Sequence, residues 1–250
     1  MGVRSPSYQA GFYAPERGGL AAYPQLSRGC VGALNPGLGP SGLVLRDWSG
    51  RKNHGVLENG PVWSTSTGHR SMLFSGGGAG RVVIAETLYQ RVGFSCWVYP
   101  ITLSPQRGIC TAGPLLNHPS FGISLTVSGT LQVFRGVHTH STATILAGVW
   151  SHIMVWSDGA TTSFFINGKH SNTVADLIDK SQQSQFYIGN NYWGAFNGYI
   201  TDVRLYRDDP RHLVSLLARR PGIAYELAPR KFISLPPSSA RLRRILTGAT

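Results

Sequence analysis

The sequence is short of acidic residues. It has 11 Asp and Glu against 23 Lys and Arg, and the only glutamates are Glu16, Glu58, Glu86 and Glu226. None of these glutamates has another carboxylate within five residues. Hydrolysis of a glycosidic bond needs two carboxyl groups that flank the bond. The sequence therefore argues against a glycoside hydrolase, and we expect no enzymatic activity.

The sequence also has few cysteines, no long apolar run and no pattern typical of a leader. Cys30, Cys96 and Cys110 form no Cys-x-x-Cys pair, and Cys96 lies in an apolar run, so we expect a buried reduced thiol there. No stretch of 18 apolar residues predicts a membrane-spanning helix. Met1 to Tyr13 shows no basic segment followed by an apolar one. We expect a protein made in the cytosol without a signal peptide.

Short apolar runs, bounded by Gly, Asn, Asp and Pro, fill the sequence between Leu43 and Tyr206. This pattern is typical of an all-β sandwich or barrel. Asp-Gly at 158–159 and Ser-Gly at 128–129 predict hairpins, and residues 150–156 are apolar on both faces, as in a strand covered twice. The expected strands are 43–47, 55–58, 72–75, 81–85, 93–99, 108–111, 121–127, 130–135, 150–157, 161–166, 185–188 and 198–206.

One short helix is expected after the last strand. Asp208 or Asp209 can cap it, Pro210 suits its first position, leucines recur at helical spacing, and Pro221 ends it. We therefore divide the chain into an N-terminal arm (1–42), a β-domain (43–218) and a basic, Pro-containing tail (219–250).

The net charge of +12 is concentrated at one end. Residues 41–203 carry 10 basic and 7 acidic groups, whereas residues 204–250 carry 10 basic and 3 acidic groups. The tail contains Arg241, Arg243 and Arg244, which could contact nucleic acid, anionic lipid or an acidic protein surface, or could simply be solvated. Because the β-domain is nearly balanced, we do not expect nucleic acid as its partner.

Five ordered motifs resemble the laminin-G-like domains of the concanavalin A-like jelly-roll superfamily. They are Asp47-Trp-Ser-Gly-Arg-Lys-Asn-His-Gly-Val-Leu57, Phe94-Ser-Cys-Trp-Val-Tyr99, residues 150–159 with Phe164-Phe-Ile-Asn-Gly168, Phe186-Tyr-Ile-Gly189, and Phe196-Asn-Gly-Tyr-Ile-Thr-Asp-Val-Arg-Leu-Tyr206. The resemblance implies an all-β fold: a concanavalin A-like jelly-roll β-sandwich of two antiparallel sheets, with one short C-terminal helix and extended N- and C-terminal arms. In that pattern Asp202 is a structural acid.

The flanks resemble single-domain members of bacteriophages and environmental bacteria that lack signal peptides. The resemblance rests on Tyr23-Pro-x-Leu, Gly29-Cys-Val-Gly-Ala33, Leu38-Gly-Pro-x-Gly42 and residues 220–230. It implies a structural subunit on a virion, as in head decoration or a tail, with other subunits and copies of itself as partners. Tyr8, Tyr13, Tyr23 and the three tail arginines are then the expected assembly contacts, and the virion is the expected location.

The alternative is an adhesion or host-attachment protein that binds cell-surface glycans outside the cell. The loop 189–198 has Asn190, Asn191, Tyr192 and Trp193 at its apex. Flat aromatic rings stack on sugars, and amide groups bond to their hydroxyls. Tyr and Trp also serve as packing lids between sheets, so both interpretations stay open for this loop.

The sequence gives little support to other chemistry. His138 and His140 lie on one face of a strand, but no third His or Cys stands nearby, and exposed loop histidines are the simpler interpretation. Asp158, Asp202 and neighbouring Asn residues leave calcium open without supporting it. Gly76 to Gly80 connects two expected strands and predicts a turn instead of a phosphate loop. No Gly-x-Ser-x-Gly elbow is present. We expect no metal and no cofactor.

Overall fold

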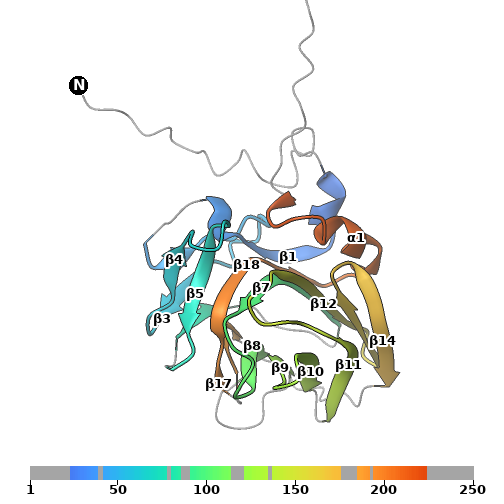
Figure 1. The fold of residues 1–250 in the computed structure, drawn as a ribbon. Coiled ribbons are helices and arrows are strands. Elements are labelled where there is room, and N and C mark those ends of the chain that lie inside the picture. The colour runs from blue at the N-terminus through green and yellow to red at the C-terminus, as the bar shows by residue number, and fades with distance from the viewer. Residues whose placement is uncertain are drawn as a thin grey trace, which may run out of the picture.

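Two antiparallel β-sheets pack face to face (Figure 1). The computed structural model describes residues 23–38, 42–77, 80–85, 91–113, 121–134, 137–175, 185–191 and 194–223. Within these residues, eight strands form each sheet. The first sheet has the order β14-β13-β12-β7-β18-β5-β4, with β1 added beside β18, and the second has the order β11-β10-β9-β8-β15-β6-β3-β2.

The first sheet consists of β1 (Cys30–Leu34), β4 (Val62–Ser64), β5 (Ser71–Ser75), β7 (Val92–Pro100), β12 (Ser151–Ser157), β13 (Thr161–Ile166), β14 (Lys169–Ala175) and β18 (Asn197–Tyr206). The second consists of β2 (Val44–Leu45), β3 (Gly55–Glu58), β6 (Arg81–Ile84), β8 (Arg107–Ala112), β9 (Phe121–Leu125), β10 (Thr130–Phe134), β11 (His138–Thr144) and β15 (Phe186–Ile188). A small hairpin, β16 (Asn190–Asn191) with β17 (Gly194–Ala195), joins β15 to β18. The expected β-sandwich of two antiparallel sheets is confirmed.

The main core lies between the two sheets. Alternate residues of each strand point inward, such as Phe94, Cys96 and Val98 of β7 and Ile123 and Leu125 of β9. All of these side chains are fully buried. Burial raises the pKa of the Cys96 thiol, which is free. The expected buried, reduced cysteine is therefore confirmed.

A second apolar layer covers part of the outer face of the first sheet. Every residue of β12 is buried: Ile153 and Val155 face the main core, whereas Met154 packs in this second layer. The cover consists of the helical turn η3 (Pro24–Ser27), the turn η5 (Arg211–Leu213) and the helix α1 (Val214–Leu217), and Cys30 and Ala33 of β1 pack in the same layer. In Figure 1 the helical pieces lie on the side of the first sheet opposite β8 to β11. The predicted doubly covered strand is confirmed.

The predicted C-terminal helix is present but short. Asp209 Oδ1 accepts the backbone N–H of Arg211 at 2.9 Å and so supports the first turn. Leu213 and Leu217 are buried against the first sheet, and Trp97 Nε1 donates a hydrogen bond to the carbonyl of Leu217 at 3.2 Å. No helix among the described residues is long and apolar enough to cross a membrane.

The N-terminal boundary of the sandwich differs from the sequence prediction. Residues 30–34 lie within the predicted arm, yet they form β1 and pair with residues 203–206 of β18. Asp47 holds this strand in place: its Oδ1 accepts the N–H of Ala33 and its Oδ2 the N–H of Asn53, both at 2.8 Å. Asn53 Nδ2 donates in turn to the carbonyl of Val31 at 2.7 Å. The motif at 47–57 therefore joins β1 to the β-domain.

The prediction also lacks the two-residue strands β16 and β17 and three longer strands: β4, β11 and β14. Two of them, β11 and β14, are edge strands, and most of their residues are exposed or half-buried. β4 is the opposite edge of the first sheet and has no buried residue. An edge strand that buries so little side-chain surface needs no apolar alternation, so periodicity cannot reveal it.

Candidate functional site

The outer face of the second sheet carries a chain of hydrogen-bonded polar side chains. Ser124 lies between the inward-facing Ile123 and Leu125, and so it points away from the core. Gln132 lies likewise between two inward-facing residues of β10. His138 and His140 of β11 pair with residues 134 and 132 of β10, which brings them to the same face. We call Gln106, Ser124, Gln132, His138 and His140 the polar face.

The members of the polar face hold one another in position. Gln106 Nε2 donates to Ser124 Oγ at 2.8 Å and also to Gln132 Oε1. Ser124 Oγ donates to Gln132 Oε1 at 3.1 Å, and Gln132 Nε2 lies 2.8 Å from His138 Nδ1. Ser124 and Gln132 are buried although they point outward. Because buried polar groups are costly to rearrange, this network presents its donors and acceptors in a fixed geometry.

The surroundings of His138 favour its uncharged form. Desolvation lowers the pKa of His138, and the neighbouring His140 lowers it further. A neutral imidazole has one donor and one acceptor nitrogen. With the amides of Gln106 and Gln132, this gives a surface of uncharged donors and acceptors, which matches ligands rich in hydroxyl groups.

The hairpin β16–β17 lies beside this face, against β8 and β9. Its base is tied to β8 because Gly189 donates its N–H to the carbonyl of Ile109 at 2.7 Å. Gly189 has φ +83°, and a Cβ there would lie 2.0 Å from the ring of Phe74. Only glycine can occupy this position, and it determines where the chain turns from β15 into the hairpin.

Two of the sequence-predicted binding residues, Asn190 and Asn191, are therefore brought next to the polar face. Asn190 is buried in β16, and Asn191 follows it in the same strand. Tyr192 and Trp193, between β16 and β17, lie outside the described residues. Sequence reasoning missed Gln106, Ser124 and Gln132. Their only signal was a polar residue between apolar ones, which any half-exposed strand shows.

The remaining predicted residues lie elsewhere. Tyr23, expected to dock on a neighbouring subunit, is half-buried and packs on the second apolar layer of its own domain. Tyr8, Tyr13, Arg241, Arg243 and Arg244 lie outside the described residues. His138 and His140 are in β11 instead of a loop, and the described residues contain no group of three metal-ligating side chains.

One serine–histidine pair has the spacing of a nucleophile and its general base, but it is buried and has no carboxylate beside it. Ser95 Oγ and His152 Nε2 lie 2.9 Å apart, and both side chains are buried beneath the second apolar layer. Burial and the nearby charge of Arg204 lower the pKa of His152 to about 3. His152 Nδ1 has no hydrogen-bond partner, so no carboxylate orients the ring. The pair is structural and does not form a catalytic triad.

Asp202 also has a structural role, as expected. It adopts φ +48° at an irregularity in the pairing of β18 with β7. Its Oδ1 accepts a hydrogen bond from Arg204 Nε at 3.1 Å, and its Oδ2 accepts the N–H of Gly222 at 2.9 Å. Both side chains are buried. The carboxylate thus ties β18 to the chain that follows the helix.

Comparison with known proteins agrees with this architecture. A family model described as the concanavalin A-like lectin/glucanases superfamily matches residues 75–210. No curated protein sequence matches the chain. Domain 4 of AbnA, an extracellular arabinanase of Geobacillus stearothermophilus solved with arabinotriose, superposes with a TM-score of 0.62 at 18% identity, over 76% of this chain and 98% of that domain.

Two toxin domains share the same fold. The binding domain of Paraclostridial Mosquitocidal Protein 1 has a TM-score of 0.61 at 15% identity, over 78% of this chain and 52% of its own. Botulinum neurotoxin type C, whose cell entry depends on two ganglioside molecules, has a TM-score of 0.59 at 13% identity, over 78% of this chain and 51% of that structure. The chain thus spans about half the length of these two structures.

Proposed function

Because this chain belongs to the concanavalin A-like lectin/glucanases superfamily, with the matched segment covering more than half of it, we propose that it is a non-catalytic glycan-binding protein. The polar face of the second sheet, together with the hairpin β16–β17, is the proposed binding site. The ligand is a cell-surface saccharide that serves adhesion or host attachment.

The observation that carries this proposal is the hydrogen-bonded network of the polar face. Sugars present closely spaced hydroxyl groups, which need fixed, uncharged donors and acceptors. Gln106, Gln132 and His138 supply these groups. Hydrogen bonds of 2.8 Å fix them in place, from Gln106 to Ser124 and between Gln132 and His138. Tyr192 and Trp193 of the neighbouring hairpin would add the flat rings that stack on a sugar.

The structural neighbours support a saccharide as the ligand class. One was solved with arabinotriose and another depends on gangliosides. Their low identity to this chain leaves the particular sugar open, so a broad glycan panel is the appropriate first experiment.

The test combines a glycan array with calorimetry on variants of the full chain. His140→Ala and Trp193→Ala should each weaken binding about tenfold or more, as expected for loss of a hydrogen bond or a stacking contact. His170→Ala is the matched control, since His170 is an exposed histidine of β14 in the other sheet. Absence of saccharide binding, or equal loss in all three variants, would contradict the proposal.

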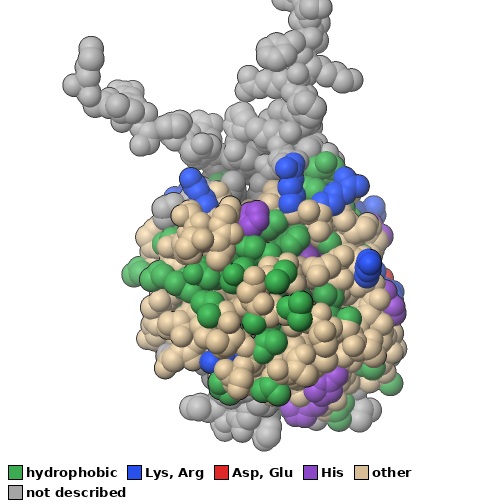
Figure 2. All heavy atoms as spheres, viewed as in Figure 1, with side chains coloured by type: hydrophobic (Ala, Val, Ile, Leu, Met, Phe, Trp, Pro, Cys, Tyr) green, Lys and Arg blue, Asp and Glu red, His purple; other side chains and the backbone are tan. Residues whose placement is uncertain are grey.

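A second candidate function is that of a virion subunit, supported by the flanking resemblance and by an apolar row on the first sheet. The row crosses neighbouring strands in register and consists of Val62, Leu73, Tyr199, Tyr99 and Trp150. Ring centroids lie 5.7 Å apart between the two tyrosines and 5.6 Å apart between Tyr99 and Trp150. Figure 2 shows hydrophobic side chains gathered over the region where Figure 1 labels β5 and β18.

Val62 is exposed and the other four residues are half-buried. This row would bind a second copy of the chain, because apolar surface patches mark association sites. Light scattering after size exclusion should then show an oligomer. Val62→Ser should weaken that oligomer, whereas Val127→Ser should not; both valines are exposed, but Val127 lies outside the row. A monomer at all concentrations, in the presence and absence of the source particle, would rule out this second function.

A further inference from the structure

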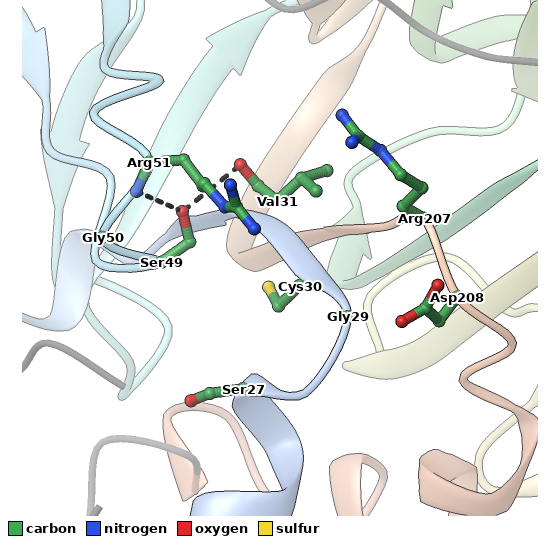
Figure 3. A pocket seen from close by; sticks show the side chains of 9 residues that line it. All are labelled: Ser27, Gly29, Cys30, Val31, Ser49, Gly50, Arg51, Arg207 and Asp208. Carbon is green, nitrogen blue, oxygen red and sulfur yellow. Dashed lines mark hydrogen bonds between the residues drawn. The ribbon is translucent and has the colours of Figure 1, made fainter. Parts of the chain in front are cut away.

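A pocket of about 450 Å³ opens at the end of the first sheet where β1 begins and β18 ends (Figure 3). Its volume lies within the range of small-molecule sites. Ser27 and Gly29 belong to the turn before β1, Arg51 to the loop after the 47–49 segment, and Arg207 and Asp208 to the chain that leaves β18. The pocket is separate from the polar face, which belongs to the other sheet.

The walls of the pocket are fixed by hydrogen bonds. Ser49 Oγ donates to the carbonyl of Val31 at 3.2 Å and accepts the N–H of Arg51 at 3.2 Å, as the dashed lines in Figure 3 show. The same hydroxyl lies 2.7 Å from Oδ2 of Asp47, which anchors β1, and shares its single proton between the two acceptors. On the other wall, a Cβ at Gly29 would lie 2.7 Å from the Cβ of Asp208, so glycine lets the two segments approach closely. A pocket built in this way exists before any ligand arrives.

The charge of the pocket is mainly positive. Arg51 and Arg207 are exposed and extend from opposite walls, with β1 between them (Figure 3). The adjacent Arg28 and Lys52 are exposed as well. Asp208 is the acidic member of the lining. Figure 2 shows Lys and Arg side chains gathered around this end of the molecule.

We propose that this pocket binds an acidic saccharide through its carboxylate or sulfate group. A guanidinium presents paired N–H donors that match two oxygens of such a group, and two guanidiniums on opposite walls can hold it from both sides. The Asp208 carboxylate and the Ser27 hydroxyl lie in the same lining and can bond to sugar hydroxyls.

The shape and charge of the pocket favour one acidic sugar over a nucleic acid. A nucleic acid needs a track of cations that follows successive phosphates. Here the described lining has the size for one small group and offers two arginines on opposite walls, not a row of cations along a strand. The proposal stands whether or not the polar face binds a glycan.

The test is calorimetric titration of the full chain with glucuronate, N-acetylneuraminate and a sulfated galactose. Glucose is the uncharged control ligand. The acidic sugars should bind and glucose should not. Arg51→Gln and Arg207→Gln should each weaken binding about tenfold, and raising the salt concentration should weaken it further. Arg70→Gln is the matched control, because Arg70 is exposed and lies outside the pocket lining.

Each other result would overturn the proposal. Equal affinity for glucose and glucuronate would show that the arginines do not recognise the acidic group of the sugar. If inorganic sulfate binds as tightly as the acidic sugars, the pocket recognises an anion and not a saccharide. Binding of single-stranded RNA that the same two variants abolish would assign the pocket to nucleic acid. His140 lies on the polar face, so His140→Ala should leave binding of the acidic sugar unchanged. This variant separates the pocket from the proposed glycan site. A thermal scan of each variant confirms that it is folded.

Discussion

Buried His152 should make the stability of this protein depend on pH. Its pKa is lowered to about 3 by burial and by Arg204, whereas an unfolded histidine has a pKa of about 6.5. Between these two pH values, His152 is protonated in the unfolded chain and neutral in the folded protein. Stability should therefore be complete above pH 6.5 and fall by about 1.4 kcal/mol per pH unit below it.

Urea unfolding at pH 7 and pH 5 measures this effect, and we expect His152 to account for about 2 kcal/mol of the difference. His152→Gln should flatten the dependence, while the exposed His170→Gln should leave it intact. The same slope in wild type and His152→Gln would show that other groups dominate.

Asp47 should contribute strongly to stability for a different reason. Its two carboxylate oxygens accept N–H groups of Ala33, Ser49 and Asn53, and the side chain is buried. In Asp47→Asn, one acceptor oxygen becomes a donor that faces N–H groups. We expect a loss of about 3 kcal/mol in the free energy of unfolding, measured by urea titration.

The exposed Asp209, bound to Arg211 at 2.7 Å, supplies the control. Asp209→Asn should cost about 1 kcal/mol or less, as for other exposed ion pairs. Equal effects at the two positions would mean that the network around Asp47 contributes no more than a surface contact.

At the scale of elements, β1 decides where the folded domain begins. It pairs with β18 and carries Cys30 and Ala33 into the second apolar layer. Removal of residues 1–34 should therefore expose the outer face of β18, including Tyr206, whose hydroxyl donates to the carbonyl of Leu26. We expect this truncation to be insoluble or to melt more than about 10 °C lower.

Removal of residues 1–22 is the matched truncation, because it keeps Tyr23, η3 and β1 in the chain. It should keep the wild-type melting temperature and circular dichroism. If both truncations behave like wild type, β1 is dispensable and the expected domain start at residue 43 is correct.

At the scale of the whole molecule, the proposed non-catalytic function rests on where four of the described carboxylates lie. Asp47 and Asp202 are buried in hydrogen-bonded networks. Glu58 pairs with Arg81 at 2.7 Å, and Asp158 accepts backbone N–H groups of its own turn. Glycosidases need an acid and a second carboxylate on either side of one bond, and these residues lie in separate structural contacts.

Incubation with arabinan, sialylated glycans and other polysaccharides should thus release no reducing ends. Release that Glu58→Gln or Asp158→Asn abolishes would identify an active site and contradict the non-catalytic assignment. Release that no carboxylate variant changes would point to a contaminating enzyme.

The sequence by itself determined the fold class. Alternating apolar residues, the turns at 128–129 and 158–159 and the motifs around Trp97 and Asp202 are local signals, since each depends on neighbours within a few residues. They were enough to predict the sandwich, the doubly covered β12 and the structural role of Asp202.

Only the tertiary structure decided what lies side by side. It placed β1 against a strand about 170 residues later, joined Gln106, Ser124, Gln132 and His138 into one face, and brought Arg51 and Arg207 to one pocket. These groupings depend on strand register and on contacts between distant segments, which periodicity does not encode. The sandwich could therefore be derived from the sequence, whereas its binding surfaces follow from the packing of the two sheets.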